Sequence, residues 1–349
     1  MVTTTQALAP GTHLATTLGL REALASDAAR LEREGVTRDD TNRLAAAGLY
    51  GVYAPAELGG AEAAEQREVA ELLAGASPDL WFVWFQHGPV VKMLAGSDNV
   101  ALQDRHLAGL ASGAVQAGVS YSHLRTARPS ILAERDTDGF LLSGTQPWCT
   151  GWGLTDIVLV GALVPDTDEV VFGLIPGGDQ AGVRSSGALD LAAMGGTATH
   201  GLVYNGLQLP ASDVVAVLPA PDFLAFDASR NTNVQPSTFG IALAALDLLE
   251  ARAPEVAAVQ RGRVLDARRR AYALLDEVAF GEQDQTRLAV RAEALLLGVE
   301  CATALLTARG GQGMDLADPA QRLLRAAAFQ IIHSQAAGIR TATLAALVT

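Results

Sequence analysis

One stretch of this sequence, residues 143–153, reads SGTQPWCTGWG and lies between two runs that favour β-strands, 139–142 and 156–160. Its glycines and its proline indicate a connection between strands, and connections held by a rigid sheet are common places for a ligand to bind. Trp148 and Thr150 suit a planar heteroaromatic ligand, because the indole can stack on the ring and the hydroxyl can reach an edge atom. A tryptophan-anchored hairpin inside a core is the alternative interpretation of the same residues.

Length and composition describe a folded protein with a large core. The chain has 349 residues, of which 49% are hydrophobic and 18% are charged, and this length allows two or three domains. A formal net charge of −13 argues against nucleic acid and anionic membranes as partners. Two cysteines, Cys149 and Cys301, fit a reduced compartment, and the six histidines show no metal-ligand spacing. Residues 1–11 lack the features of a secretory signal, so we expect a cytoplasmic protein.

The pattern of the chain changes twice along its length. Apolar residues recur at steps of three and four over 16–34 and in further segments up to residue 112, which indicates about five helices. The segment 114–217 has short runs of β-favouring residues separated by Gly, Pro, Asp and Ser. Helical patterns then return over 235–253, 254–277, 283–309 and 319–347. Helices on both sides of an all-β segment are an uncommon order.

Four parts of the sequence resemble the acyl-CoA dehydrogenase superfamily, and the resemblance extends over about residues 17–348. They are YAPAELGG at 53–60, DGFLLSG at 138–144 followed by WCT at 148–150, MGGTATH at 194–200 with the run to 215, and GGQG at 310–313 followed by RLLR at 322–325.

The resemblance implies an α+β fold with three domains. These are an N-terminal α-helical domain (1–113), a middle β-barrel domain (114–220) and a C-terminal antiparallel four-helix bundle (221–349). It also implies FAD as the cofactor, a homodimer or homotetramer, and dehydrogenation of an acyl thioester. In that reaction a carboxylate takes a proton from the α-carbon, and a hydride passes from the β-carbon to the flavin.

A set of flavin contacts also follows from the resemblance. In the family, the residue matching Trp148 packs on the flavin, and the one matching Thr150 bonds the edge of its ring. Trp152 is either a second wall or a packing residue, and Ser120 and Ser122 offer hydroxyls or backbone amides to the flavin.

Two further features of the sequence concern the other end of the cofactor. Gly310, Gly311 and Gly313 match a tight turn that reaches the FAD of a neighbouring subunit, where their amides can approach a diphosphate. The loop that holds that FAD in the family looks shortened here, over 253–268. Either FAD is held more weakly here, or Arg261 or Arg263 supplies the contacts.

The catalytic carboxylate of the family is missing at both of its usual positions. Matching Ile339 and Arg340 to the family pattern puts Ser334 where the glutamate of the last helical segment belongs. No acid lies between Asp318 and the C-terminus. The other position, at the start of the first bundle helix, falls near Arg230.

Three functions therefore remain open. The first is an FAD-dependent oxidoreductase acting on a hydrophobic small molecule or thioester other than a standard fatty acyl-CoA. The second is a flavin-dependent monooxygenase that uses O₂ and reduced flavin from a separate reductase, with His333 near the flavin. The third is a non-catalytic partner subunit in a heteromeric acyl-CoA dehydrogenase.

The candidate catalytic residues are His333 and Ser334, and a histidine buried at a bundle interface is the alternative for His333. The helix expected over 79–94 is apolar nearly all round and matches the family helix that lines the acyl pocket. Its Phe85 and His87, with Arg230, are the candidate substrate contacts.

Overall fold

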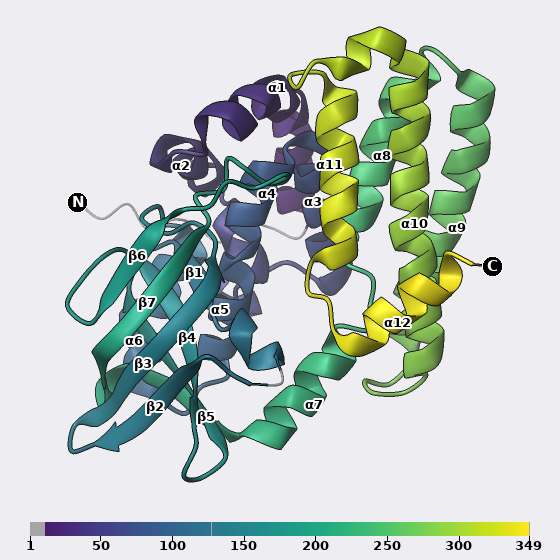
Figure 1. Cartoon of the computed structure of the whole chain (residues 1–349). Helices are drawn as coiled ribbons and strands as arrows, with labels where there is room; N and C mark the ends of the chain where they lie inside the picture. Colours follow the sequence, from purple (N-terminus) through teal and green to yellow (C-terminus); the bar gives the residue numbers. More distant parts are fainter. Residues whose placement is uncertain (1–10, 127, 349) are drawn as a thin grey trace.

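The computed structural model describes residues 11–126 and 128–348. It contains a layer of helices, a curled β-sheet and a set of long helices in that order, so the predicted α+β class is confirmed (Figure 1). Residues 1–10, on which the expectation about a secretory signal rests, lie outside the described part of the chain. No helix within the described part has the length and apolar character needed to cross a bilayer.

In the described residues 11–113, the N-terminal layer consists of six α-helices. They are α1 (Thr12–Glu34), α2 (Arg38–Ala46), α3 (Ala63–Ala76), α4 (Pro78–Phe85), α5 (His87–Ala95) and α6 (Val100–Ser112). Helix α2 begins with a capping box, in which Thr37 and Asp40 each bond the other's backbone N–H. The single helix predicted over 79–94 is instead two, α4 and α5. Pro89 has no N–H to donate to the Phe85 carbonyl, and its ring would clash with that carbonyl in a continuous helix.

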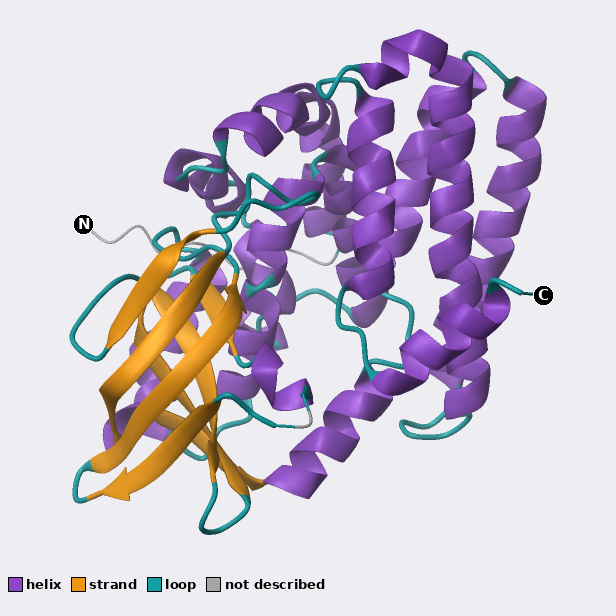
Figure 2. Ribbon diagram, viewed as in Figure 1, coloured by secondary structure: helices purple, strands orange, loops and turns teal. Residues whose placement is uncertain are grey.

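Eight strands form one sheet. They are β1 (Ala117–Ser120), β2 (Ile131–Asp136), β3 (Gly139–Cys149), β4 (Ile157–Val164), β5 (Glu169–Pro176), β6 (Val183–Ala188), β7 (His200–Pro210) and β8 (Val214–Pro219). Their order is β6-β7-β3-β2-β4-β5-β8, and β1 pairs with β4 in parallel. A Cβ added to Gly173 of β5 would lie 2.4 Å from Leu209 of β7, so these strands face each other across the interior. The sheet therefore curls into a barrel-like shape (Figure 2).

The C-terminal helices begin directly after β8. They are α7 (Ala220–Arg230), α8 (Pro236–Glu250), α9 (Pro254–Glu277), α10 (Asp284–Arg309), α11 (Pro319–Ile332) and α12 (Ala337–Ala346). Helix α7 was not predicted, and it runs from the sheet to the bundle (Figure 1). The helix predicted over 319–347 is interrupted at 333–336, where Ser334 takes a left-handed backbone with φ of 52°.

Two cores explain how these parts are joined. One is shared by the N-terminal helices and the bundle, and includes Leu73, Trp81, Phe239 and Leu297. Outside the curled sheet, apolar residues of β4 and β5 pack against α5 and α6. The sheet edge, the α4–α5 break, the α7–α8 turn and the α11–α12 turn thus surround one region of the molecule.

Candidate active site

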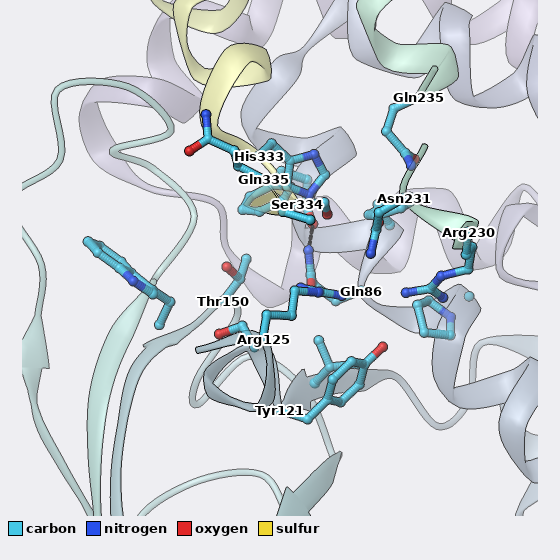
Figure 3. A pocket seen from close by; sticks show the side chains of 18 of the residues that line it. Gln86, Tyr121, Arg125, Thr150, Arg230, Asn231, Gln235, His333, Ser334 and Gln335 are labelled. Carbon is cyan, nitrogen blue, oxygen red and sulfur yellow. Dashed lines mark hydrogen bonds between the residues drawn. The ribbon is translucent and has the colours of Figure 1, made fainter. Parts of the chain in front are cut away.

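A cavity of about 1710 Å³ lies where these elements meet. In Figure 3, Thr150 lies on the sheet side, Arg230 comes from the opposite side, and His333 and Ser334 lie above Tyr121. Small-molecule pockets are usually about 300–1,000 Å³. This cavity therefore has room for a cofactor and a substrate together.

The sheet side of the cavity carries the quoted stretch. The register between β3 and β7 shifts between Gln146 and Cys149, and such an irregularity re-aims the side chains that follow it. The Trp148 side chain lines the cavity and is 53% exposed, whereas Cys149 is fully buried in the sheet core. Gln146 lines the cavity too, and its buried Oε1 has no hydrogen-bond partner. The sheet therefore offers a free indole and an orphaned acceptor.

A chain of three hydroxyls ends in this cavity. Thr197 donates to the Met194 carbonyl at 2.7 Å, the Thr197 and Thr199 hydroxyls are 2.7 Å apart, and those of Thr199 and Thr150 are 3.0 Å apart. A carbonyl can only accept, and each hydroxyl has one hydrogen. Thr199 must therefore donate to Thr197, and Thr150 to Thr199. Thr150 is left with lone pairs and can only accept a further hydrogen bond.

His333 lies in a cage of aromatic rings at the end of α11. It stacks on Phe329 at 5.2 Å and meets Phe82 and Phe85 edge-on at 5.1 and 5.9 Å. Burial lowers the pKa of His333 to about 3, and the charges of Arg291 and Arg125 act in the same direction. Its Nδ1 is buried without a partner. The ring therefore stays neutral near pH 7.

Arg291 of α10 holds the two turns next to His333. Its side chain is almost fully buried and donates to the backbone carbonyls of Asn231, Asn233 and His333. Burial lowers the pKa of Arg291 to about 10, so the group remains charged at neutral pH. This explains the break between α11 and α12, because the terminal carbonyl of α11 bonds a side chain of another helix.

A second cluster joins the loop after β1 to the end of α7. Arg125 bonds both oxygens of Asp227, at 2.6 and 2.9 Å, and Arg230 bonds one of them at 2.9 Å. Asn231 donates to the same carboxylate at 3.0 Å. Burial alone would raise the pKa of Asp227, but the two arginines hold it below its usual value.

The charged groups of the lining all have the same sign. Among the lining residues that the structure describes there is no Asp or Glu. The cationic ones are Arg67, Lys92, Arg125, Arg230, Arg325 and Arg340. Four of them pair with carboxylates that lie outside the lining: Arg67 with Asp276, Arg125 and Arg230 with Asp227, and Arg325 with Glu32.

The predicted site residues divide into two groups. Seven of them line the cavity, namely Phe85, Ser122, Trp148, Thr150, Arg230, His333 and Ser334. The others lie outside it, namely Ser120, His87, Trp152, Gly310, Gly311 and Gly313.

The residues outside the cavity have structural partners. Ser120 is fully buried and bonds the Tyr204 hydroxyl at 2.8 Å. His87 bonds the Leu110 carbonyl and the Ala117 N–H, at 3.2 Å each, so neither ring nitrogen is free for a substrate. The Trp152 indole donates to Asp179 at 3.0 Å. These side chains hold the fold together around the site.

The arginines that might compensate for the shortened loop also lie elsewhere. Only residues 251–253 separate α8 from α9, and Arg261 and Arg263 are within α9. Arg261 pairs with Asp247 and Glu250, and Arg263 with Glu300. The glycine turn at 310–313 lies at the far end of α10 from the α11–α12 break (Figure 1). Its predicted contact with a neighbouring subunit stays a prediction.

Several lining residues were not predicted from the sequence. They are Gln86, Tyr121, Thr199, Asn231, Gln235 and Phe329. Arg125 lines the cavity as well. The single signal for the cluster was the DASRN run at 227–231, in which one acid and one base share a helix end.

The observed groups fit a flavin. An exposed indole can cover one face of a planar ring, while the Thr150 hydroxyl and the orphaned Gln146 oxygen can accept ring N–H groups. The cationic lining can approach phosphates.

Neither the protein-family models nor the curated proteins yield a match to this sequence. Solved structures do match over nearly the whole chain. Butyryl-CoA dehydrogenase from Megasphaera elsdenii has a TM-score of 0.81 at 16% identity, covering 97% of this chain and 97% of that one. A glutaryl-coenzyme A dehydrogenase in complex with glutaryl-CoA gives 0.80 at 18% identity, covering 96% and 95%. Dibenzothiophene monooxygenase from Paenibacillus sp. A11-2 gives 0.77 at 18% identity, covering 95% of each chain. The chain therefore has the fold of the acyl-CoA dehydrogenases, which a monooxygenase shares.

Proposed function

We propose that this chain is a flavin-dependent oxidoreductase acting on a hydrophobic small molecule or thioester other than a standard fatty acyl-CoA. The observation that carries the proposal is the combination of a flavin-compatible wall at Trp148 and Thr150 with a described lining that holds no carboxylate. Taking an α-proton from a simple thioester needs a positioned base, and a carboxylate is the usual one in this chemistry. The substrate must therefore be more acidic or must react in another way.

The residues around the proposed flavin bind and orient more than they move protons. A flavin bound here supplies the redox chemistry. With its pKa near 3, the neutral His333 ring offers one N–H and one lone pair for hydrogen bonding, and it is a weak base at pH 7. Phe82, Phe85 and Phe329 exclude water around it.

A monooxygenase is the second candidate, and the direction of the hydroxyl chain favours it. Thr150 can only accept a hydrogen bond while Thr197 donates to the Met194 carbonyl. Reduced flavin carries a hydrogen on N5, whereas oxidised flavin has a bare nitrogen there. With N5 placed against Thr150, the hydroxyl would accept from the N5–H of the reduced form, which is the form that a separate reductase would deliver.

The first experiment asks whether the full-length protein binds flavin, and which one. Purified protein is titrated with FAD and with FMN, and binding is followed by the quenching of flavin fluorescence. Any flavin that copurifies is released and identified by chromatography. Micromolar binding of either supports the proposal. Absence of binding, alone and after co-expression with a neighbouring homologue, contradicts it. Colour acquired only on co-expression supports the partner-subunit alternative.

The second experiment separates the two reactions. Anaerobic bleaching of the bound flavin by an acyl-CoA supports a dehydrogenase. Product formation that needs a flavin reductase, NADH and O₂ supports a monooxygenase.

A further inference from the structure

The cluster at Arg125, Asp227 and Arg230 leaves hydrogen-bond donors unused at the cavity. Arg125 donates hydrogen bonds from its Nε and one Nη to Asp227, and Arg230 donates one from an Nη to the same carboxylate. A guanidinium has five N–H groups. Figure 3 shows the two side chains extending toward each other from opposite sides of the cavity. Donors from two different elements thus converge on one place.

The charges around this place are unbalanced. Two guanidinium groups, those of Arg125 and Arg230, pair with the single carboxylate of Asp227. A third, that of Arg291, bonds the backbone carbonyl of the neighbouring Asn231. The partners of Arg291 are backbone carbonyls, which leave its charge uncompensated. A buried excess of positive charge is costly unless an anion joins it.

Apart from Lys92, whose pKa is lowered by burial and by the charge of Arg230, the groups beside the cluster are apolar or neutral. The aromatic rings of Phe82, Phe85 and Phe329 face the cavity around the neutral ring of His333. The Tyr121 side chain lies below the arginines in Figure 3 and lines the same space. A ligand that fills this region therefore meets apolar surface along its body and cations at one end.

We propose that the substrate of the proposed flavin reaction is an apolar, ring-bearing acid whose carboxylate binds between Arg125 and Arg230. The inference rests on the proposed function in that it calls the bound acid a substrate. The anion site itself does not need a flavin. Arg230 is the better donor, because its side chain is 41% exposed and has one ion pair, whereas Arg125 is committed to Asp227 through two bonds.

The flavin phosphates are the other source of an anion, and the geometry favours the substrate. Thr150, the proposed flavin contact, lies on the side of the cavity opposite Arg230 (Figure 3). With the flavin ring against the sheet, the Arg230 end faces the substrate. A variant of Arg230 should therefore change substrate affinity and leave flavin affinity unchanged.

The test compares an acid with its neutral isostere. Phenylacetate and phenylacetamide have the same shape and differ in charge, and their affinities for the full-length protein are measured by calorimetry with and without bound flavin. Arg230→Gln removes the charge but keeps Asp227 paired with Arg125. Arg340→Gln is the matched control, because Arg340 lines the same cavity and bonds only the Gln335 side chain.

We expect the native protein to prefer phenylacetate by about tenfold or more, since a charge-assisted pair is lost with the amide. Arg230→Gln should reduce this preference to about twofold or less, and Arg340→Gln should keep it. A native protein that binds the acid no better than the amide, or an Arg230→Gln variant that keeps the preference, overturns the anion site.

The same variants also test, separately, whether the anion at this site belongs to the substrate or to the flavin, and whether the proposed function holds. If Arg230→Gln loses flavin affinity while its preference for the acid is unchanged, the cluster binds a flavin phosphate and the inference is wrong. If the native protein binds no flavin but still prefers the acid in an Arg230-dependent way, the proposed function fails and the anion site stands.

Discussion

At the scale of single residues, the hydroxyl of Thr150 is the group whose behaviour the structure constrains most. Its hydrogen is used on Thr199, because the chain ends at a carbonyl that can only accept. In Thr199→Val, Thr150 loses that acceptor and is free to donate. We expect the preference of the protein for reduced over oxidised flavin to fall by about threefold or more, which is the effect of one hydrogen bond.

The measurement is the midpoint potential of the bound flavin, which falls when oxidised flavin gains a donor. Thr155→Val is the control, because Thr155 is also buried and its hydroxyl bonds Gly151 outside the chain of three. An unchanged potential in Thr199→Val, with flavin still bound, would show that the hydroxyl direction does not matter.

Two buried histidines give a prediction for acid stability. Burial lowers the pKa of His333 and of His87 to about 3 each, whereas an unfolded histidine has a pKa of about 6.5. The unfolded chain therefore binds more protons between these values. The contribution of the two histidines to the free energy of unfolding is complete above about pH 6.5. It is lost as the pH falls toward 3, by up to about 1.4 kcal/mol per pH unit for each histidine.

Urea unfolding at several pH values between about 7 and 5 measures this slope. His333→Phe keeps an aromatic ring in the cage of Phe82, Phe85 and Phe329 and removes the titrating group, so we expect a shallower slope. The same slope in the variant, or an NMR titration of His333 near its ordinary pKa, contradicts the prediction.

The predicted residues that line the cavity share one property. Trp148, Thr150 and Ser334 could be located from short motifs, because each sits at a fixed distance from its neighbours in the chain. Ser120 and His87 could not be judged in this way. Their partners, Tyr204 and Leu110, lie 84 and 23 residues away.

At the scale of elements, the crossing of α3 and α8 depends on a glycine. A Cβ at Gly240 would lie 2.0 Å from the backbone carbonyl of Glu71, which cannot move aside as a side chain can. We expect Gly240→Ala to reduce the free energy of unfolding by about 1–3 kcal/mol or more through overpacking. Thermal and urea unfolding both report the change.

Gly262 provides the matched control. It lies inside α9, and nothing is within 4 Å of an added Cβ. Gly262→Ala should therefore stabilise the protein by up to about 1 kcal/mol, because alanine has the higher helix propensity. Similar losses for both substitutions would mean that the α3–α8 crossing is not tight.

Helix interiors were easier to predict than interruptions. The periodic pattern located α9 and α10 within a residue or so, and Pro89 gave a visible signal for the break between α4 and α5. The break at 333–336 contains neither Pro nor Gly. It depends on Arg291, which is 42 residues away from His333 and bonds its carbonyl.

At the scale of the whole molecule, positive charge is gathered in the cavity of an acidic protein. The net charge is −13, while the described cavity lining has six cations and no carboxylate. The general surface field repels anions at long range, and the cavity attracts them at short range. Added salt screens the first effect more than the second, since buried charges are screened less.

The bundle presents apolar side chains that a single chain leaves exposed. On α9, Val256, Val259 and Leu265 are 46%, 66% and 47% exposed. A groove of about 670 Å³ between α8, α9 and α10 is lined in part by Val256. Val256 and Val259 are three residues apart and share one face of α9, and exposed apolar surface of this kind is typical of a contact between subunits. We expect a second copy of this chain to cover it.

Val259→Asp tests this, because it places a charge beside Val256 on the same face of α9. We expect the molar mass by light scattering to fall toward that of one chain, 36.2 kDa, while Val203→Asp leaves the mass unchanged. Val203 is similarly exposed, at 46%, but lies on β7.

If the glycine turn at 310–313 completes a neighbour's flavin site, as the resemblance implies, Val259→Asp must also lose flavin affinity. A variant that dissociates and still binds flavin as tightly as the native protein would show that one chain holds the cofactor alone.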